Sequence, residues 1–160
     1  MEQIDITSTL QVYDNLEELS EDIQDLMKKA VEARDNAYAP YSNFKVGAAI
    51  LLEDNQIVTG NNQENAAYPS GLCAERVAIF HASAMYPDKK MITIALAARS
   101  ENKILRIPTP PCGACRQVIA EYEIKQDQPI AIYFMAEKGK VIKVDSIKTL
   151  LPLVFDPSYL

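Results

Sequence analysis

The amino-acid sequence predicts an α/β protein, a three-layer α/β/α sandwich in which helices cover both faces of a mixed sheet of about five strands. Segments with the apolar spacing of helices alternate with short apolar segments typical of strands, in the order α-β-β-α-β-α-β-β-α. The first two strands adjoin as a hairpin, whereas two later strands are separated by a helix. The sheet therefore needs both antiparallel and parallel neighbours.

The first half of the chain predicts a helix followed by a hairpin. The helix should begin near Ser20 and end before Pro40, because proline disfavours helical backbone in the residue that precedes it. Alternating apolar residues then predict a strand over 44–52, and a turn at 54–55 leads into a returning strand over 56–60.

The second half predicts two helices that alternate with strands. Residues 91–98 are almost continuously apolar, as in a strand that is covered on both faces. The predicted elements are a helix from 73 to about 85, a strand at 91–98, a helix at 113–123, strands at 130–135 and 141–144, and a short helix from 146. Alternating apolar residues within 1–13 leave two alternatives open, an additional edge strand or a loose arm.

Composition limits the function. The 160 residues carry a net charge of −6, which argues against a protein that binds nucleic acid through its phosphates. Neither a membrane-spanning apolar run nor a secretory signal is visible. The three cysteines form an odd set in such a chain, so we expect reduced thiols and a cytoplasmic location.

The cysteines predict a metal site. Cys112 and Cys115 are three residues apart, so they share one face of a helix, and Cys73 lies 39 positions upstream of Cys112. Each group falls at a predicted helix start, where unpaired N–H groups and the helix dipole favour the thiolate that binds metal. Three thiolates favour zinc, and a fourth position left to water is what catalysis requires.

Other interpretations of the cysteines remain. Cys112 and Cys115 alone could form a redox pair, and all three thiols could be buried structural residues. A closed structural zinc site would need a fourth ligand, for which His81 is the only histidine. His81 lies eight residues beyond Cys73, about 12 Å along a helix, which is too far for two ligands of one ion.

Glu75 can belong to the same site as Cys73 only under one geometric condition. Residues two apart on a regular helix, such as Cys73 and Glu75, point in opposite directions. They can share a site only if the metal lies just beyond the helix N-terminus and Cys73 precedes the regular helix. We expect that geometry. The alternative for Glu75 is a solvated acid stabilised by the helix dipole.

The metal-binding segments resemble the cytidine deaminase family in its short, three-cysteine form. The similarity includes Cys73-Ala-Glu-Arg and Pro111-Cys-Gly-Ala-Cys-Arg-Gln, and extends to residues 38–49, 60–68 and 150–155. It covers roughly residues 20–160. The chain is therefore expected to be one cytidine deaminase-like domain over 1–160, with 1–19 as an N-terminal extension.

The resemblance implies a reaction. Such an enzyme hydrolyses cytidine and 2′-deoxycytidine to uridine and 2′-deoxyuridine plus ammonia, a step of pyrimidine salvage. One Zn²⁺ per subunit would provide the bound water that acts as nucleophile, and Glu75 would carry the protons. The family form is usually a homotetramer with shared active sites.

The resemblance also implies roles for individual residues. Arg76, or less directly Arg116, would draw charge from the three thiolates. The substrate contacts that it implies are Asn62 and Glu64 to the ribose 3′-hydroxyl, Phe44 and the Ala74 backbone to the base, and Phe155 and Tyr68 across a subunit interface.

Two other functions are compatible with part of the sequence. A deaminase of the same chemistry could act on another aminated ring, such as a blasticidin-type antibiotic, but a ribose clamp of Asn62 and Glu64 argues against it. A zinc-stabilised binding module without catalysis is the alternative from another class. The nucleoside hydrolase, with no nucleic-acid or membrane partner, is the function that we expect.

Overall fold

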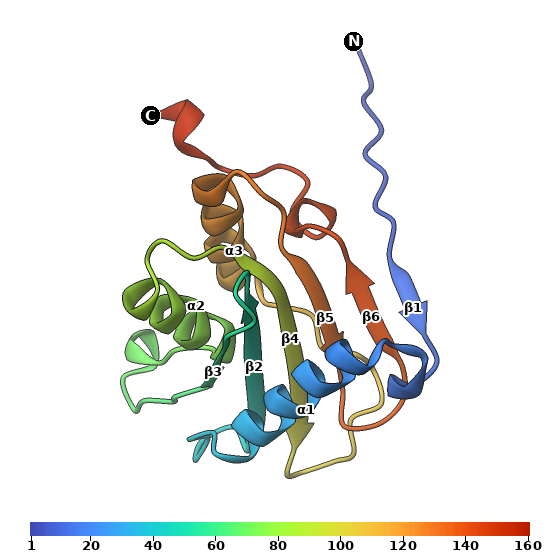
Figure 1. The fold of residues 1–160 in the computed structure, drawn as a ribbon, viewed down its shortest axis with the longest axis vertical. Helices are drawn as coiled ribbons and strands as arrows, with labels where there is room; N and C mark the ends of the chain where they lie inside the picture. The colour runs from blue at the N-terminus through green and yellow to red at the C-terminus, as the bar shows by residue number, and fades with distance from the viewer.

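The computed structural model describes residues 1–160 and contains one mixed sheet with helices on both faces (Figure 1). In chain order the main elements are β1 (Gln11–Tyr13), α1 (Glu21–Asp35), β2 (Phe44–Leu52), β3 (Ile57–Asn61), α2 (Ala74–Met85), β4 (Met91–Ser100), α3 (Gly113–Gln126), β5 (Ala131–Met135) and β6 (Val141–Val144). Short 3-10 helices occupy Leu16–Glu18, Tyr68–Ser70, Ile147–Thr149 and Pro157–Tyr159.

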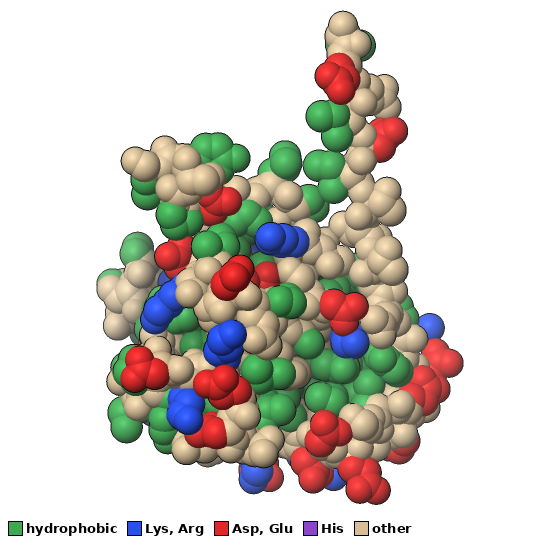
Figure 2. Space-filling view, turned by 45° about the horizontal axis from the view of Figure 1, so that its top comes forward, with side chains coloured by type: hydrophobic (Ala, Val, Ile, Leu, Met, Phe, Trp, Pro, Cys, Tyr) green, Lys and Arg blue, Asp and Glu red, His purple; other side chains and the backbone are tan.

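The sheet is mixed and has helices on both faces, which confirms the expected α/β class, and it has six strands rather than about five. The strand order is β1-β6-β5-β4-β2-β3, and β4–β5 is the parallel pair among antiparallel neighbours. The sixth strand is β1, which pairs over Gln11–Tyr13 with β6 and so satisfies backbone groups at that edge. Residues 1–10 form no regular element and project from the body as an arm (Figures 1 and 2).

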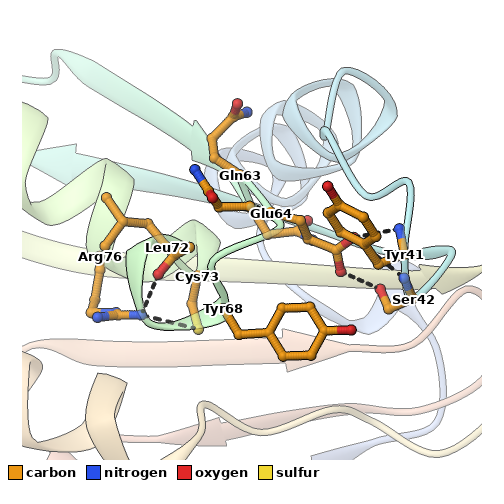
Figure 3. Close-up of a pocket in the computed structure, with 11 residues that line it drawn as sticks. Tyr41, Ser42, Gln63, Glu64, Tyr68, Leu72, Cys73 and Arg76 are labelled. Carbon is orange, nitrogen blue, oxygen red and sulfur yellow. Dashed lines mark hydrogen bonds between the residues drawn. The ribbon is translucent and has the colours of Figure 1, made fainter.

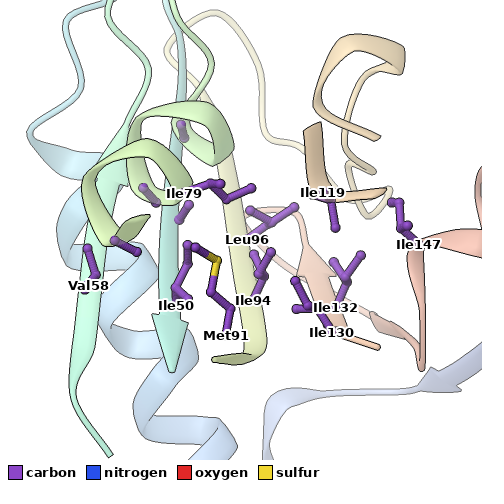
Figure 4. Close-up of a cluster of buried hydrophobic side chains, with 14 of the residues drawn as sticks. Ile50, Val58, Ile79, Met91, Ile94, Leu96, Ile119, Ile130, Ile132 and Ile147 are labelled. Atoms are coloured by element: carbon purple, nitrogen blue, oxygen red, sulfur yellow. The ribbon is translucent and has the colours of Figure 1, made fainter. Parts of the chain in front are cut away.

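Alternation along the strands divides the core into two layers. In β2, Ala48, Ile50 and Leu52 face α2 and α3, whereas Ala49 faces α1. The larger layer, between the sheet and the pair α2 and α3, is rich in isoleucine (Figure 4). Burial on both faces explains why β4 has an almost continuous apolar sequence.

Two glycines allow the helices to approach the sheet closely. A Cβ atom on Gly60 of β3 would lie 2.5 Å from the Ala78 nitrogen and 2.9 Å from the Ala74 oxygen, both in α2. A Cβ atom on Gly47 of β2 would collide with the backbone of α1 on the opposite face. The first turn of α2 is therefore placed by direct contact with the backbone of β3.

A buried carboxylate joins the end of α3 to the strands that follow it. Glu123 accepts hydrogen bonds from the N–H groups of Ile130 and Ile147, both at 2.9 Å, and from the Ser146 hydroxyl at 2.7 Å. A buried carboxylate is costly without hydrogen-bond partners, so these three donors stabilise Glu123 and hold residues 130 and 146–147 against the end of α3.

The start of α3 holds the C-terminal segment. Arg116 donates to the carbonyl oxygens of Pro111 at 2.9 Å and Leu150 at 2.8 Å. The Gln117 amide donates to the carbonyl oxygen of Phe155 at 2.8 Å. The C-terminal segment is therefore anchored to the start of α3 at Leu150 and Phe155, although the Leu153 and Phe155 side chains are exposed.

The surface carries charged side chains of both signs, as Figure 2 shows, and the tips of the arm and the tail expose apolar side chains. None of the helices is both long and apolar enough to cross a lipid bilayer.

The contact between β3 and α2 gives the first prediction. Gly60→Ala should lower the free energy of unfolding by about 1–3 kcal/mol, because the added methyl group has to push α2 away from the sheet. Denaturant titration measures this change, and zinc content should fall with it. Gly113→Ala is the matched control, since its Cβ would meet no atom within 4 Å. Equal stability of the Gly60→Ala variant and the unmodified protein would contradict the packing argument.

Candidate active site

Three thiols meet where α2 and α3 begin. Cys73 and Cys112 are the N-cap residues of these helices, with extended backbone, and Cys115 lies in the first turn of α3. The Cys73 and Cys112 sulfur atoms are 3.9 Å apart, the Cys112 and Cys115 sulfur atoms 3.5 Å, and all three lie within 4.8 Å of one another. The expectation that Cys73 precedes the regular helix is confirmed.

The spacing of the sulfur atoms fits a tetrahedral zinc ion. Zinc–sulfur bonds of about 2.3 Å place tetrahedral thiolates about 3.8 Å apart, close to the observed separations. The metal-binding group contains the three cysteines and no histidine or carboxylate, and His81 lies exposed farther along α2. Three protein donors leave one coordination position open, which is the arrangement of catalytic rather than structural zinc sites.

The surroundings favour negative charge on the sulfur atoms. The N-terminal ends of two helices point their free N–H groups toward the cluster. The pKa of Cys73 is lowered to about 5, mainly by a hydrogen bond from the Cys115 thiol and also by Arg76. Burial acts in the opposite direction but does not outweigh these effects. The same hydrogen bond, together with burial, raises the pKa of Cys115.

Arg76 is the cation nearest the sulfur atoms. Its Nη2 atom lies 3.8 Å from the Cys73 sulfur and 3.3 Å from the carbonyl oxygen of Gly71, and its buried Nε atom has no hydrogen-bond partner. Arg116, the weaker candidate for this role, is instead held by the carbonyl groups of Pro111 and Leu150. Arg76 alone is placed to withdraw charge from a thiolate.

Glu75 reaches the same site as the thiols despite its position two residues after Cys73. Its side chain is only 5% exposed and lines a cavity of about 370 Å³ together with Cys73 and Cys112. Burial raises the pKa of the Glu75 carboxyl above its ordinary value. A carboxyl group with a raised pKa beside an open metal position is suited to accept and return a proton.

The other expected substrate residues fall in two places. Phe44, Asn62, Glu64 and the start of α2 at Ala74 line the cavity that holds Glu75. Tyr68 lines an adjoining cavity of about 460 Å³, where its ring lies edge-on to Tyr41 at 6.1 Å (Figure 3). Phe155 lines neither cavity; its side chain is 59% exposed on the tail.

The polar residues of the cavity are already engaged with backbone groups. The Asn62 side chain accepts from the Val46 N–H at 2.8 Å and donates to the Phe44 carbonyl at 2.9 Å, so it holds the start of β2. Its amide retains capacity for a second acceptor and a second donor bond. The Glu64 carboxylate accepts hydrogen bonds from the N–H groups of Tyr41 and Ser42 and from the Ser42 hydroxyl.

Sequence reasoning missed Ser42, Thr109 and Pro110, which also line the cavity with Glu75. Ser42 lies inside residues 38–49, one of the segments that carried the resemblance, but no periodicity marks it. Its partner Glu64 is 22 positions away, so the pattern of the sequence could not reveal the contact.

Comparison with known proteins identifies the family. The family model described as "Cytidine and deoxycytidylate deaminase zinc-binding region" matches residues 20–128, which contain all three cysteines and Glu75. The chain belongs to this family. It is a zinc-dependent deaminase, and Zn²⁺ is its cofactor, in agreement with the open three-thiolate geometry.

Individual relatives agree with this assignment. A cytidine deaminase of Halalkalibacterium halodurans is 48% identical over 100 residues, which cover 62% of this chain and 71% of that protein. One from Sporosarcina psychrophila is 40% identical over 134 residues, 84% of this chain and 91% of that protein. The crystal structure of cytidine deaminase from Burkholderia pseudomallei superposes with a TM-score of 0.73 at 37% identity, covering 86% of this chain and 100% of that one.

The convergence of two helix starts on one ion gives the second prediction. Cys112→Ser should release zinc and lower thermal stability, because α2 and α3 are then no longer tied through the metal. Metal analysis and a thermal melt measure both effects. Ser70→Ala, a change at an exposed residue outside the cluster, is the control. A zinc-free Cys112→Ser variant that melted like the unmodified deaminase would contradict a stabilising role for the ion.

Proposed function

We propose that this deaminase hydrolyses cytidine and 2′-deoxycytidine to uridine and 2′-deoxyuridine with release of ammonia, a reaction of pyrimidine salvage. The observation that supports it best is the cavity of about 370 Å³, because its wall combines two zinc-ligand cysteines and Glu75 with an aromatic residue and polar side chains. The two relatives from Halalkalibacterium halodurans and Sporosarcina psychrophila are cytidine deaminases.

Zinc bound by Cys73, Cys112 and Cys115 would supply a Lewis acid that lowers the pKa of a water ligand to about 7 and so provides the nucleophile. Three thiolates outweigh the charge of the ion by one unit. Arg76, which donates to the Cys73 sulfur, would offset this excess and preserve the Lewis acidity.

Glu75 would carry the protons of the reaction. As the water oxygen bonds to C4 of the pyrimidine, the Glu75 carboxylate accepts the proton that the water loses and delivers it to N3. The same carboxylate would then accept the remaining proton of the C4 hydroxyl and pass it to the amino group, so that the C4–N4 bond breaks as the C4 carbonyl forms and ammonia leaves. Burial of Glu75 supports this role, because it raises the pKa of the carboxyl group above its ordinary value.

The remaining residues of the cavity would hold the nucleoside. Phe44 would contact the base and the Ala74 N–H its carbonyl oxygen, while Asn62 and Glu64 would bind the ribose 3′-hydroxyl. Lysine and arginine do not line this cavity, so a 5′-phosphate would find no cationic partner there. That supports a free nucleoside, rather than a nucleotide or a nucleic acid, as the substrate.

We also propose a homotetramer with shared active sites, one domain over 1–160 and a cytoplasmic location. Tyr68 and Phe155 remain 75% and 59% exposed although each ring contacts one other aromatic ring, Tyr41 and Tyr159 respectively, and this exposed aromatic surface supports a contact with another subunit. The family model begins at residue 20, which supports residues 1–19 as an extension. The unpaired state of all three cysteines supports a reducing compartment.

The role of Glu75 gives the third prediction. Glu75→Gln should keep zinc but lower kcat for cytidine by about 10²–10⁴-fold, because the amide cannot accept the proton of water. Loss of cytosine absorbance measures the rate, and metal analysis measures the zinc. Glu121→Gln, at an exposed position of α3, is the matched control. Cytidine turnover by Glu75→Gln at the rate of the control would refute the proton-transfer role.

The exposed tail gives the fourth prediction. Phe155→Ala should raise KM for cytidine several-fold, about fivefold or more, if the ring stacks on the base in a neighbouring subunit. The control is Leu153→Ala, which removes an exposed apolar side chain from the same tail. Specific activity of the unmodified deaminase should also fall on dilution below the dissociation concentration, as measured beside sedimentation velocity. An unchanged KM in Phe155→Ala would exclude the stacking role.

A further inference from the structure

Ser42 connects two residues of the proposed substrate site through a single hydroxyl group. It lies in the turn between α1 and β2, where its Oγ donates to Glu64 Oε1 at 2.5 Å and accepts from the Phe44 N–H at 3.0 Å. The carboxylate assigned to the ribose and the residue assigned to the base are therefore joined by one side chain, although Phe44 begins β2 and Glu64 lies in the segment after β3.

The turn supplies every hydrogen bond that the structure gives to the Glu64 carboxylate. Besides the Ser42 hydroxyl, the N–H groups of Tyr41 and Ser42 donate to Oε2 at 2.9 and 3.3 Å, and Figure 3 shows these groups directed at the carboxylate. Burial alone would raise the pKa of Glu64, but these three donors lower it below its ordinary value. The carboxylate is therefore ionised and acts as an acceptor.

The number of donors limits what Glu64 can bind. A carboxylate offers about four acceptor positions, and the turn fills three of them. One position remains for a ligand, and its direction is set by the donors that occupy the others. A carboxylate fixed in this way can receive one hydroxyl group without first reorienting, which reduces the cost of ordering on binding.

We propose that Ser42 is a positioning residue for the nucleoside. Its hydroxyl orients the Glu64 carboxylate toward the ribose 3′-hydroxyl. The inference rests on the proposed function, because it takes the hydroxyl acceptor role of Glu64 from there. Ser42 acts through Glu64 and does not itself touch the reacting atoms.

A substrate without the 3′-hydroxyl separates this role from a purely structural one. Ser42→Ala removes the donor to Oε1 but leaves both backbone donors to Oε2. It should lower kcat/KM for cytidine by about tenfold, and for 3′-deoxycytidine by less than about twofold, because the latter makes no hydrogen bond to Glu64. Ser42→Thr retains a hydroxyl and should restore the preference for cytidine.

The controls establish that the variant is intact. Ser8→Ala removes a serine hydroxyl that donates to the Thr149 carbonyl in another part of the molecule, and it should leave both rates unchanged. Zinc content and thermal melting should match between Ser42→Ala and Ser8→Ala. In a Glu64→Ala background, adding Ser42→Ala should cost no further activity, because the positioned group is gone.

The outcomes are distinguishable. The proposal is overturned if Ser42→Ala lowers kcat/KM for both nucleosides by the same factor, or for neither, or if its effect persists in the Glu64→Ala background. It is also overturned if the unmodified deaminase turns over cytidine and 3′-deoxycytidine equally well, since Glu64 then binds no 3′-hydroxyl. Failure of the unmodified deaminase to act on cytidine would instead refute the proposed function itself.

Discussion

Two helices begin at the same point, and three sulfur atoms occupy it. Cys73, Cys112 and Cys115 would repel one another as thiolates, yet the free N–H groups of both helix starts stabilise negative charge there. A divalent cation resolves this conflict, because it neutralises most of the thiolate charge and joins the two helices at once. The open coordination position, the location of Glu75 and the shape of the cavity all depend on that junction.

The position of the junction is itself set by packing. The first turn of α2 rests on Gly60, where a side chain would not fit, so the sheet determines how far Cys73 projects. Cys73 is the N-cap, and Glu75 is only two residues later, yet both face one cavity because the site lies beyond the end of the helix. Neighbouring residues can thus provide a metal ligand and a proton carrier.

Local patterns determined how much could be predicted. The strands at 44–52 and 141–144 have the expected limits, because alternation and turn residues define them within a few positions. The thiol cluster was predicted from the spacing of Cys112 and Cys115 together with the helix start expected at Cys73, and the structure brings the three sulfur atoms together. β1 stayed open, because its pairing with β6 joins segments about 130 residues apart, and a short polar-apolar segment says nothing of its partner.

The polar contacts of the site were the least predictable part. Asn62 and Glu64 looked equivalent in the sequence, but Asn62 completes the pairing of the β2 backbone, whereas Glu64 is held by the turn before that strand. The role of Ser42 depends on that turn, and Arg116 binds carbonyl groups rather than sulfur. Such contacts depend on the three-dimensional arrangement of distant segments, which periodicity does not encode.

The start of α3 carries residues that serve two different purposes. Cys115 belongs to the thiol cluster, and the next two residues, Arg116 and Gln117, hold the carbonyl groups of Leu150 and Phe155. Metal coordination and the placement of the C-terminal segment therefore depend on consecutive residues of one helix. A shift of this helix turn would move a zinc ligand and the anchor of the C-terminal segment together.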